Sequence, residues 1–314
     1  MGYARNLNQS ANSTTFFALQ PLTQRPFPYW GRIESRESGG SASYNSLQIE
    51  LNRRYQNGLT FTGAYTLAKN LTDIGGPSPS EFGGETGNGR IENAFSRERG
   101  NMYGTRRHRF IGTAVYELPF GKGRAFMSHT SGLVNGIFGG WRLSSILLLQ
   151  TGPYETPYFS GGDPSGSGSG FYRTQRPDRV GKGTVSNPTA SQFFDRNAFV
   201  CPGQTVGSAS QFNCHIGLNP ASDLAPIGRF GNSGIGILEG PGSFNLSAAL
   251  GKSFAITERV AIKVEGSFTN VPNHVNLADP NLNIGSSAFG QITRARDSEF
   301  GAGRTGQIGV RIDF

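Results

Sequence analysis

Apolar and polar residues alternate along much of this sequence, most clearly at its C-terminal end. In the segment GQIGVRIDF, residues 306–314, every second position is apolar: Ile308, Val310, Ile312 and Phe314. A period of two places successive side chains on opposite faces of an extended strand. The segment therefore predicts a strand with one apolar and one polar face, held firmly although chain ends commonly fray.

Six further segments show a related pattern, so the sequence predicts seven strands. Their ranges are 47–55, 59–67, 107–118, 141–150, 244–250, 260–269 and 307–314. The third is ambiguous in parity, and we assign Phe110, Ala114, Tyr116 and Leu118 to the apolar face because Arg109 suits the polar one. The dipeptide Asn57-Gly58 is a strong hairpin signal between the first two. The expected fold class is all-β, an antiparallel meander.

The connections between these strands are short at one end of the meander and long at the other. Residues 56–58 and 255–259 are tight and 119–140 is intermediate, whereas 69–105, 152–240 and 271–304 are long and carry no strand pattern. Long extracellular loops and short periplasmic turns are typical of outer-membrane barrels. We therefore expect part of a transmembrane β-barrel, with an aromatic girdle at the periplasmic strand ends formed by Tyr55, Trp141, Phe254 and Phe314.

Composition fits this interpretation. The 314 residues include 46 glycines, and the longest aliphatic run, 146–149, is far too short for a membrane-spanning helix. Membrane strands need only ~9–11 alternating residues, so they stay possible. The net charge of +8 raises nucleic acid as a partner, but the basic residues are scattered apart from Arg106, Arg107 and Arg109. We interpret that group as a solvated rim and expect no nucleic acid partner.

Several longer segments resemble a known family. The segments "YNSLQIELNRRYQNGLTFTGAYTLAKNL" (44–71), "RRHRFIGTAVYELPFGKGR" (106–124), "GGWRLSSILLLQTGPYETP" (139–157) and "GPGSFNLSAALGKSFAITERVAIKVEGSFTNVPNHVNL" (240–277), with "FGQIT" (289–293) and the terminal Phe314, are similar to TonB-dependent outer-membrane receptors of the Oar-like subgroup. The resemblance covers about residues 20–314.

The resemblance implies a barrel of about 22 strands in the outer membrane of a Gram-negative bacterium. An N-terminal plug would close it, and the TonB system would supply energy for importing a large ligand. The chain matches the C-terminal third of such a receptor, so contact with TonB would run through an N-terminal part that it lacks. We expect residues 1–43 to be a truncated extracellular loop segment and 44–314 to be barrel. Seven strands are too few to close, so the sheet should be open and curved.

Extracellular loops capture the ligand in this family, which makes loop aromatic and basic residues the binding candidates. These are Tyr154, Tyr158, Phe171, Tyr172, Arg173 and Arg176. The ligand is unknown, an oligosaccharide or a peptide, and ordinary loop packing is the alternative role for each residue. Cys201 and Cys214 lie in the same long loop, so on the oxidising side of the membrane they should form a disulfide.

Catalytic signatures are lacking in the sequence. The four histidines form no HxH or HxxxH pair, and the glycine-rich stretch 161–170 lacks the Lys-Ser/Thr of a phosphate-binding loop. We therefore expect no metal, no cofactor and no enzymatic activity. The alternative is a soluble secreted β-sandwich binding module, with carbohydrate as one class of ligand. The apolar faces argue against it because they are nearly free of charge, with Arg53 and Lys252 as exceptions near the periplasmic end.

The C-terminal strand resembles the signal that the barrel-assembly machinery reads. An extended segment can donate backbone hydrogen bonds to a receptor edge while alternate side chains fill pockets. Phe314 would be the anchor, and Ile308, Val310 and Ile312 the apolar row that later faces outer-membrane lipid. A plain edge strand that happens to end on Phe is the alternative.

Overall fold

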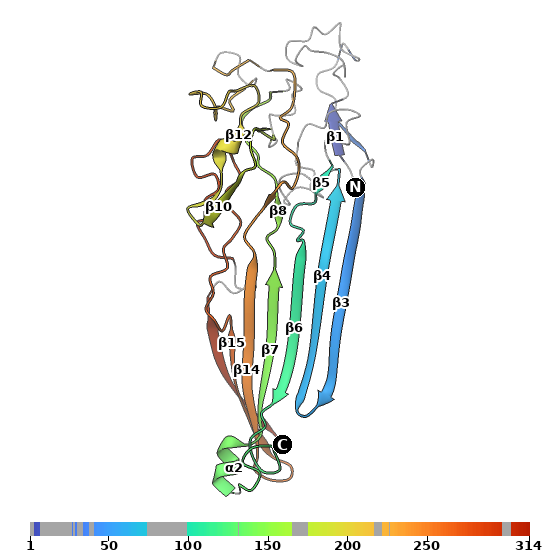
Figure 1. The fold of residues 1–314 in the computed structure, drawn as a ribbon, viewed down its shortest axis with the longest axis vertical. Helices are drawn as coiled ribbons and strands as arrows, with labels where there is room; N and C mark the ends of the chain where they lie inside the picture. Colours follow the sequence, from blue (N-terminus) through green and yellow to red (C-terminus); the bar gives the residue numbers. More distant parts are fainter. Residues whose placement is uncertain are drawn as a thin grey trace.

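The computed structural model describes residues 3–6, 27, 29, 34–37, 41–73, 99–130, 132–164, 175–216, 222–225, 227–296 and 303–314. One large antiparallel sheet dominates these residues (Figure 1). Its spatial order is β16-β15-β14-β7-β6-β4-β3, and the short β5 (Gly100–Asn101) pairs with β4. The all-β antiparallel fold class is confirmed.

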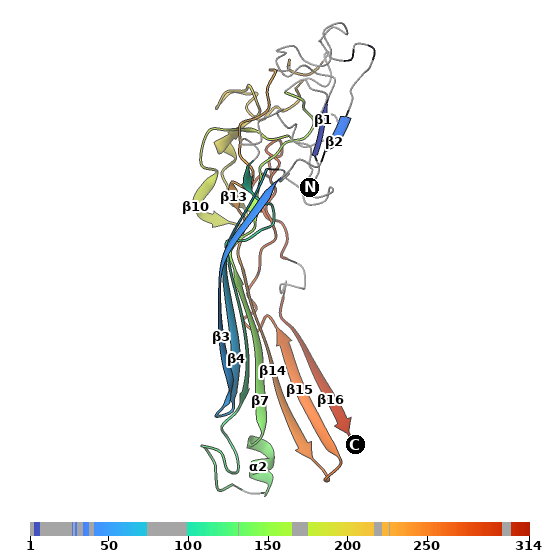
Figure 2. The ribbon, with the colours of Figure 1, turned by 90° about the vertical axis from the view of Figure 1, so that its right-hand side faces the viewer.

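The seven long strands are the seven that alternation predicts. They are β3 (Ala42–Gln56), β4 (Leu59–Thr72), β6 (His108–Glu117), β7 (Trp141–Gln150), β14 (Ser243–Ala255), β15 (Ala261–Thr269) and β16 (Thr305–Asp313). The structure extends β3, β4 and β14 by several residues beyond the predicted ranges. The sheet is open and curved, with β3 and β16 at its two edges (Figure 2).

The hairpin between β3 and β4 turns at the predicted dipeptide. Asn57 and Gly58 both have positive φ, 53° and 80°, as a type I′ turn requires. A Cβ on Gly58 would also lie 2.9 Å from the carbonyl oxygen of Glu117 in β6. Glycine is therefore required here both for the turn and for the close approach of the neighbouring strand.

Register places the apolar sides of all the strands on one face of the sheet. Directly paired residues share a face, and one row of partners crosses five strands: Ile49, Tyr65, Phe110, Leu149 and Phe244. The same pairing puts Ala114 opposite Phe61 and Tyr116 opposite Leu143, so the assigned parity of the ambiguous strand is confirmed.

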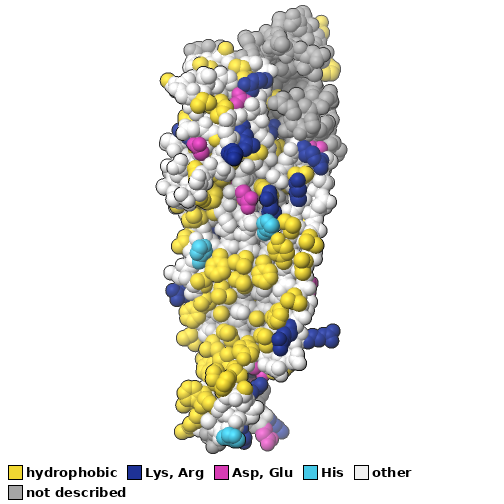
Figure 3. Space-filling view, viewed as in Figure 1, with side chains coloured by type: hydrophobic (Ala, Val, Ile, Leu, Met, Phe, Trp, Pro, Cys, Tyr) yellow, Lys and Arg dark blue, Asp and Glu magenta, His cyan; other side chains and the backbone are white. Residues whose placement is uncertain are grey.

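This apolar face is uncovered among the described residues. Exposed fractions are 62% for Leu51, 54% for Ile49 and 80% for Ile308. Figure 3 shows a broad band of hydrophobic side chains across the lower half of this view. A soluble sandwich buries such a face against a second sheet, so the structure does not favour the soluble-module alternative.

Tyr55, at the end of β3, does not lie on the apolar face as the alternation in the sequence predicts. The register of β3 and β4 shifts between Arg53 and Gln56, which marks a bulge. Past the bulge Tyr55 turns to the polar side, where its hydroxyl donates a 2.7 Å hydrogen bond to Glu117. Its place in an outward-facing girdle was therefore wrong, because one extra residue inverts side-chain parity.

The hydrophobic core lies in the long connections rather than on the sheet. We call the described residues of 151–242 and 270–296 the cap; Figure 2 shows it at the end of the sheet opposite the C-terminus. Its buried core residues are Phe159, Phe194, Ala198, Phe199, Cys201, Cys214, Ile216, Leu238, Leu282, Ile284 and Phe289. Connections expected to be long and irregular are thus packed together around a core of their own.

Short antiparallel ladders organise the cap. They are β8 (Tyr154–Glu155) with β13 (Leu238–Glu239), β9 (Asp178–Arg179) with β12 (Phe199–Val200), and β10 (Thr184–Thr189) with β11 (Gln192–Phe194). A 3₁₀ turn, η4 (Arg196–Ala198), leads into β12. Outside the cap, β1 (Tyr3–Asn6) pairs with β2 (Glu34–Glu37) within the expected N-terminal loop segment. A short helix, α2 (Gly132–Phe138), lies at the other end of the sheet, near the C-terminus (Figure 1).

The open edges predict how the isolated chain behaves. Among the described strands, β3 and β16 have a partner on one side only and lie beside an uncovered apolar face, and such edges template aggregation. Expressed alone, the chain should aggregate rather than insert into membranes or detergent as a monomer. Size-exclusion chromatography and heat-dependent gel migration in detergent measure this. A stable, heat-modifiable monomer would contradict the prediction.

Candidate functional site

A pocket of about 390 Å³ opens on the polar face where the sheet meets the cap. Its lining comes from four strands and from the turn before β6. The lining residues are Tyr44, Gln48, Thr66, Ala68, Asn70, Gly104, Thr105, Arg106, Arg109 and Gln150. Apart from Ala68 and Gly104, the side chains offer hydroxyl, amide or guanidinium groups.

Strand register brings the central part of this lining together. Gln48 pairs with Thr66, Thr66 with Arg109, and Arg109 with Gln150. Paired residues project on the same side, so the four form one polar row across β3, β4, β6 and β7. Residues separated by up to a hundred positions in sequence thus become neighbours.

The pocket contains two guanidinium groups, and they differ in how firmly the surrounding protein holds them. Arg106 is half-buried, and one terminal nitrogen donates a 2.6 Å hydrogen bond to the carbonyl of Thr151. Burial, followed by the nearby charge of Arg296, lowers the pKa of Arg106. Arg109 is exposed on its strand. The pair provides one fixed and one adaptable donor fork, an arrangement that suits carboxylate or sulfate groups on a polar ligand.

A carboxyl cluster lies next to this pocket, in the cap, and consists of the buried Glu155 and the exposed Asp279. Asp279 and Arg296 form an ion pair at 2.7 Å, and Arg296 also donates to the carbonyl of Pro241. Glu155 is fully buried, and its carboxyl oxygens meet no N–H or hydroxyl donor among the described residues; the group that it contacts is the carboxyl of Asp279. Burial, and then the negative charge of Asp279, raise the pKa of Glu155 to about 9. Glu155 is therefore neutral at pH 7.

The same cluster acts on a tyrosine beside the pocket. Burial, then Asp279 and Glu155, raise the pKa of Tyr103 to about 12. Its phenol therefore stays protonated throughout the physiological range. Arg106 links the cluster to the pocket, since the charges of Asp279 and Glu155 act on its pKa in the opposite direction to burial.

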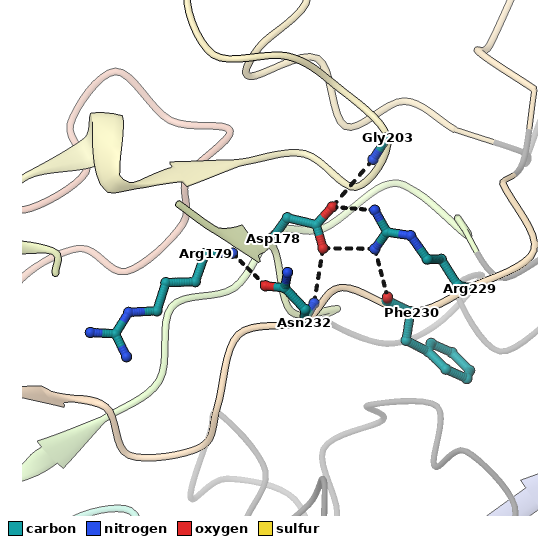
Figure 4. A network of polar contacts seen from close by, with 6 residues as sticks. All are labelled: Asp178, Arg179, Gly203, Arg229, Phe230 and Asn232. Atoms are coloured by element: carbon teal, nitrogen blue, oxygen red, sulfur yellow. Dashed lines mark hydrogen bonds and ion pairs between the residues drawn. The ribbon is translucent and has the colours of Figure 1, made fainter. Parts of the chain in front are cut away.

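A second polar network holds the upper part of the cap together (Figure 4). Both oxygens of Asp178 bind the guanidinium of Arg229, at 2.8 and 2.7 Å, and the backbone N–H of Asn232 donates to the same carboxylate at 2.9 Å. Burial alone would raise the pKa of Asp178, but these donors hold it below its ordinary value. The Asn232 side chain accepts from the backbone of Arg179, and Gly203 N–H points at Asp178.

A disulfide joins Cys201 and Cys214 beside this network. Their Cα atoms are 5.2 Å apart, and both residues belong to the buried core of the cap. A bridge across 13 residues restricts the unfolded chain and stabilises the folded one by about 3 kcal/mol in the chain-entropy model. Disulfide, ion pair and buried core thus all link segments of the cap to one another.

The predicted loop contacts divide into two groups. Tyr154 is buried, and its hydroxyl accepts a 2.9 Å hydrogen bond from Arg107; Arg176 is buried and donates to the carbonyl of Ser233. Tyr158 packs partly buried against the cap core. The structure thus packs these three side chains within the cap, and a ligand contact for each stays a prediction. Phe171, Tyr172 and Arg173 lie outside the described residues.

Sequence reasoning missed the pocket arginines. It interpreted residues 106–109 as a solvated rim, although the parity of Arg109 already placed it on the polar face with Gln150. Within the described ranges, no group of three or more His, Cys, Asp or Glu side chains could hold a metal ion. No helix in that part of the chain is long and apolar enough to cross a membrane.

Comparison with known families gives one match, and it spans almost the whole chain. A family model described as an outer membrane beta barrel domain matches residues 1–307. Searches of curated proteins and of solved structures give no match. The family match agrees with the open antiparallel sheet and its uncovered apolar face.

The buried Glu155 predicts a pH-dependent cap. Between the unfolded pKa near 4.5 and the folded value of about 9, only the folded state retains the proton. Stability should therefore fall as pH rises through this window, by on the order of 3 kcal/mol at pH 7. Glu155→Gln should remove this dependence and slow cap opening at pH 8, as measured by hydrogen exchange of the cap backbone in the membrane-inserted protein.

A matched control for this test is Glu239→Gln, at an exposed carboxylate on the neighbouring strand β13. It should keep the wild-type pH dependence. Cap exchange in the wild type that stays unchanged between pH 5 and 8, after correction for intrinsic exchange, would contradict the role of Glu155.

Proposed function

The chain belongs to the outer membrane beta barrel domain family and is an outer-membrane protein of a Gram-negative bacterium; from that premise we propose that it forms part of the wall and mouth of a receptor that imports a large ligand with energy supplied through TonB. The role is binding and transport rather than catalysis. The plug and the contact with TonB belong to the N-terminal part of such a receptor.

One observation carries this proposal, the polar pocket beneath a folded cap. A barrel wall needs only strands and turns, but here the long connections bury a core of their own and hold it with the Asp178–Arg229 pair and a disulfide. A rigid cap above a lumen-facing pocket supports selective capture better than it supports an open channel. Binding sites in general combine such rigid scaffolds with a few convergent polar groups.

The pocket chemistry also narrows the ligand class. Arg106 and Arg109 supply positive charge, Tyr44 an aromatic ring, and the side-chain amides both donors and acceptors. A hydroxyl-rich molecule with acidic groups can bind all three: its acidic groups pair with the arginines, its hydroxyls bond to the amides, and its rings stack on the tyrosine. We therefore favour an acidic oligosaccharide over a peptide, and the family resemblance of the strands supports the TonB-dependent route.

The decisive test is uptake by cells that express the full-length receptor. A fluorescent oligogalacturonate should accumulate in cells with an intact TonB system and fail to accumulate without TonB or with a protonophore. Losing one charge-assisted hydrogen bond costs ~1.5–3 kcal/mol. The double variant Arg106→Ala/Arg109→Ala should therefore reduce binding at least ~tenfold at equal surface expression.

The matched control is Arg259→Ala, which removes the same charge at the exposed turn on the far side of the membrane. Its uptake should equal that of the wild type. Accumulation that persists without TonB would overturn the import mechanism, whereas unchanged binding by the double variant would overturn the pocket. An acidic peptide of similar charge, taken up in preference to the oligosaccharide, would overturn the ligand class.

Assembly gives a second prediction, which concerns the edge strand β16. Ile308, Val310 and Ile312 project from it at the sheet's open edge, and Phe314 follows, 98% exposed. We propose that the barrel-assembly machinery reads this row by strand addition. Deleting Phe314 in the full-length receptor should sharply reduce outer-membrane levels, measured by immunoblot of membrane fractions, with transcript unchanged.

Gln307→Ser is the control for the deletion, since Gln307 lies on the polar face of the same strand. This variant should assemble like the wild type. Equal assembly of both variants would mean that β16 is an ordinary edge strand.

A further inference from the structure

The helix α2 exposes its apolar side. Its four large apolar residues are uncovered by the rest of the described chain: Leu133, Val134, Ile137 and Phe138. At 100° per residue these positions fall within an arc of about 140°, one side of the helix. Leu133 is 85% exposed. Phe126 and Met127, in the preceding turn, are exposed as well.

The segment that carries α2 is closely packed, so the exposure does not come from a loose loop. The backbone N–H of Lys122 donates to the side chain of Asn135 at 2.7 Å, and the rings of Phe120 and Phe126 lie 5.6 Å apart. A Cβ on Gly121 would lie 2.7 Å from the Cα of Gly139. The two ends of the segment therefore touch each other directly.

Side chains of the apolar face fasten α2 to the sheet. The ammonium of Lys252 donates to the carbonyls of Gly136 and Ile137, and the indole N–H of Trp141 donates to Ile137 at 2.8 Å. Lys252 and Trp141 pair across β14 and β7, on the face that also carries Leu143 and Leu250. Lys252 also lies 4.9 Å from the Phe254 ring centre. These bonds hold the C-terminal end of α2 against β7 and β14, at the bottom of the sheet in Figure 1.

We propose that α2 is a membrane-interface anchor that docks into the phospholipid headgroup layer on the periplasmic side of the outer membrane. Its apolar side continues the lipid-facing surface of the sheet, and lipid is the environment which that surface already requires. The connecting segment 118–140 contains Lys122 and Arg124 and no acidic residue. Arg124 pairs with Glu117 at 2.8 Å, which leaves Lys122 as the residue to contact anionic headgroups.

Spin labels test the docking directly. The two native cysteines of this chain are joined to each other, so new cysteines at Leu133 and Ile137 can be labelled in the full-length protein in phosphatidylethanolamine–phosphatidylglycerol vesicles. The matched control is Gly136→Cys, which lies outside the apolar arc of α2 and where a Cβ meets no atom within 4 Å.

Lipid-soluble oxygen should increase the spin-relaxation rate of labels at 133 and 137. A water-soluble nickel complex should relax these two labels about fivefold less than it relaxes the label at 136. Equal access of nickel to all three sites would overturn the proposal. Protection that arises only after periplasmic extract is added would overturn it too, because the occupant would then be a protein. Measuring the protection from nickel at two receptor concentrations tests whether a second copy of the protein covers α2. Protection that rises with receptor concentration would overturn the proposal, because the occupant would then be another receptor and not lipid.

A separate experiment tests whether Lys122 contacts anionic headgroups. Label depth at 133 should decrease when phosphatidylglycerol is replaced by phosphatidylcholine, and Lys122→Gln should remove that dependence on lipid charge. Depth that is independent of phosphatidylglycerol in the wild type would overturn the anionic headgroup contact.

Discussion

The shared register of seven strands is the constraint on which the rest of the structure depends. Each strand alternates, but only pairing in phase gathers Ile49, Tyr65, Phe110, Leu149 and Phe244 into one transverse row. A slip of one residue in any ladder would bring polar side chains onto the apolar face. In a bilayer such a slip is costly, because Arg or Lys at the midplane costs ~2–4 kcal/mol. The same register assembles the polar row of the pocket on the other face.

A sheet whose apolar face meets lipid has no core of its own to stabilise the long connections. The cap therefore carries a separate core around Phe159 and Phe199, with the Asp178–Arg229 pair and the disulfide beside it. Burial of Glu155 beside the carboxylate of Asp279 is unfavourable for its charged form, so the neutral form is favoured. Position explains its effect: Glu155 borders the ion pair and Arg106, so its protonation is coupled to the electrostatics of the pocket.

The sequence predicts the strands well because period two is a local signal that neighbouring residues carry together. It predicts the cap poorly, since the buried core gathers residues such as Phe159 and Phe289 from segments more than a hundred positions apart and leaves no periodic pattern in the sequence. Tyr55 was misplaced because a bulge is a one-residue event. Tyr154 and Arg176 are ligand candidates by residue type and loop position, and neither property predicts that the fold buries them. Arg106 stands out in the sequence as part of a basic group, but only the fold shows that it lines a pocket with Asn70 and Gln150.

Lys252 is a charged residue on the apolar face, and its position explains why a charge is tolerated there. Lys252 lies near the end of its strand, where the carbonyls at the C-terminal end of α2 carry partial negative charge and the Trp141 and Phe254 rings present their faces. An ammonium there is solvated by protein groups rather than by lipid, so its burial is compatible with a membrane-facing surface. Replacing it with an apolar residue would keep the face hydrophobic but would lose both hydrogen bonds to α2. Lys252, a charged exception to the lipid-facing pattern, thus joins the transmembrane sheet to the helix α2.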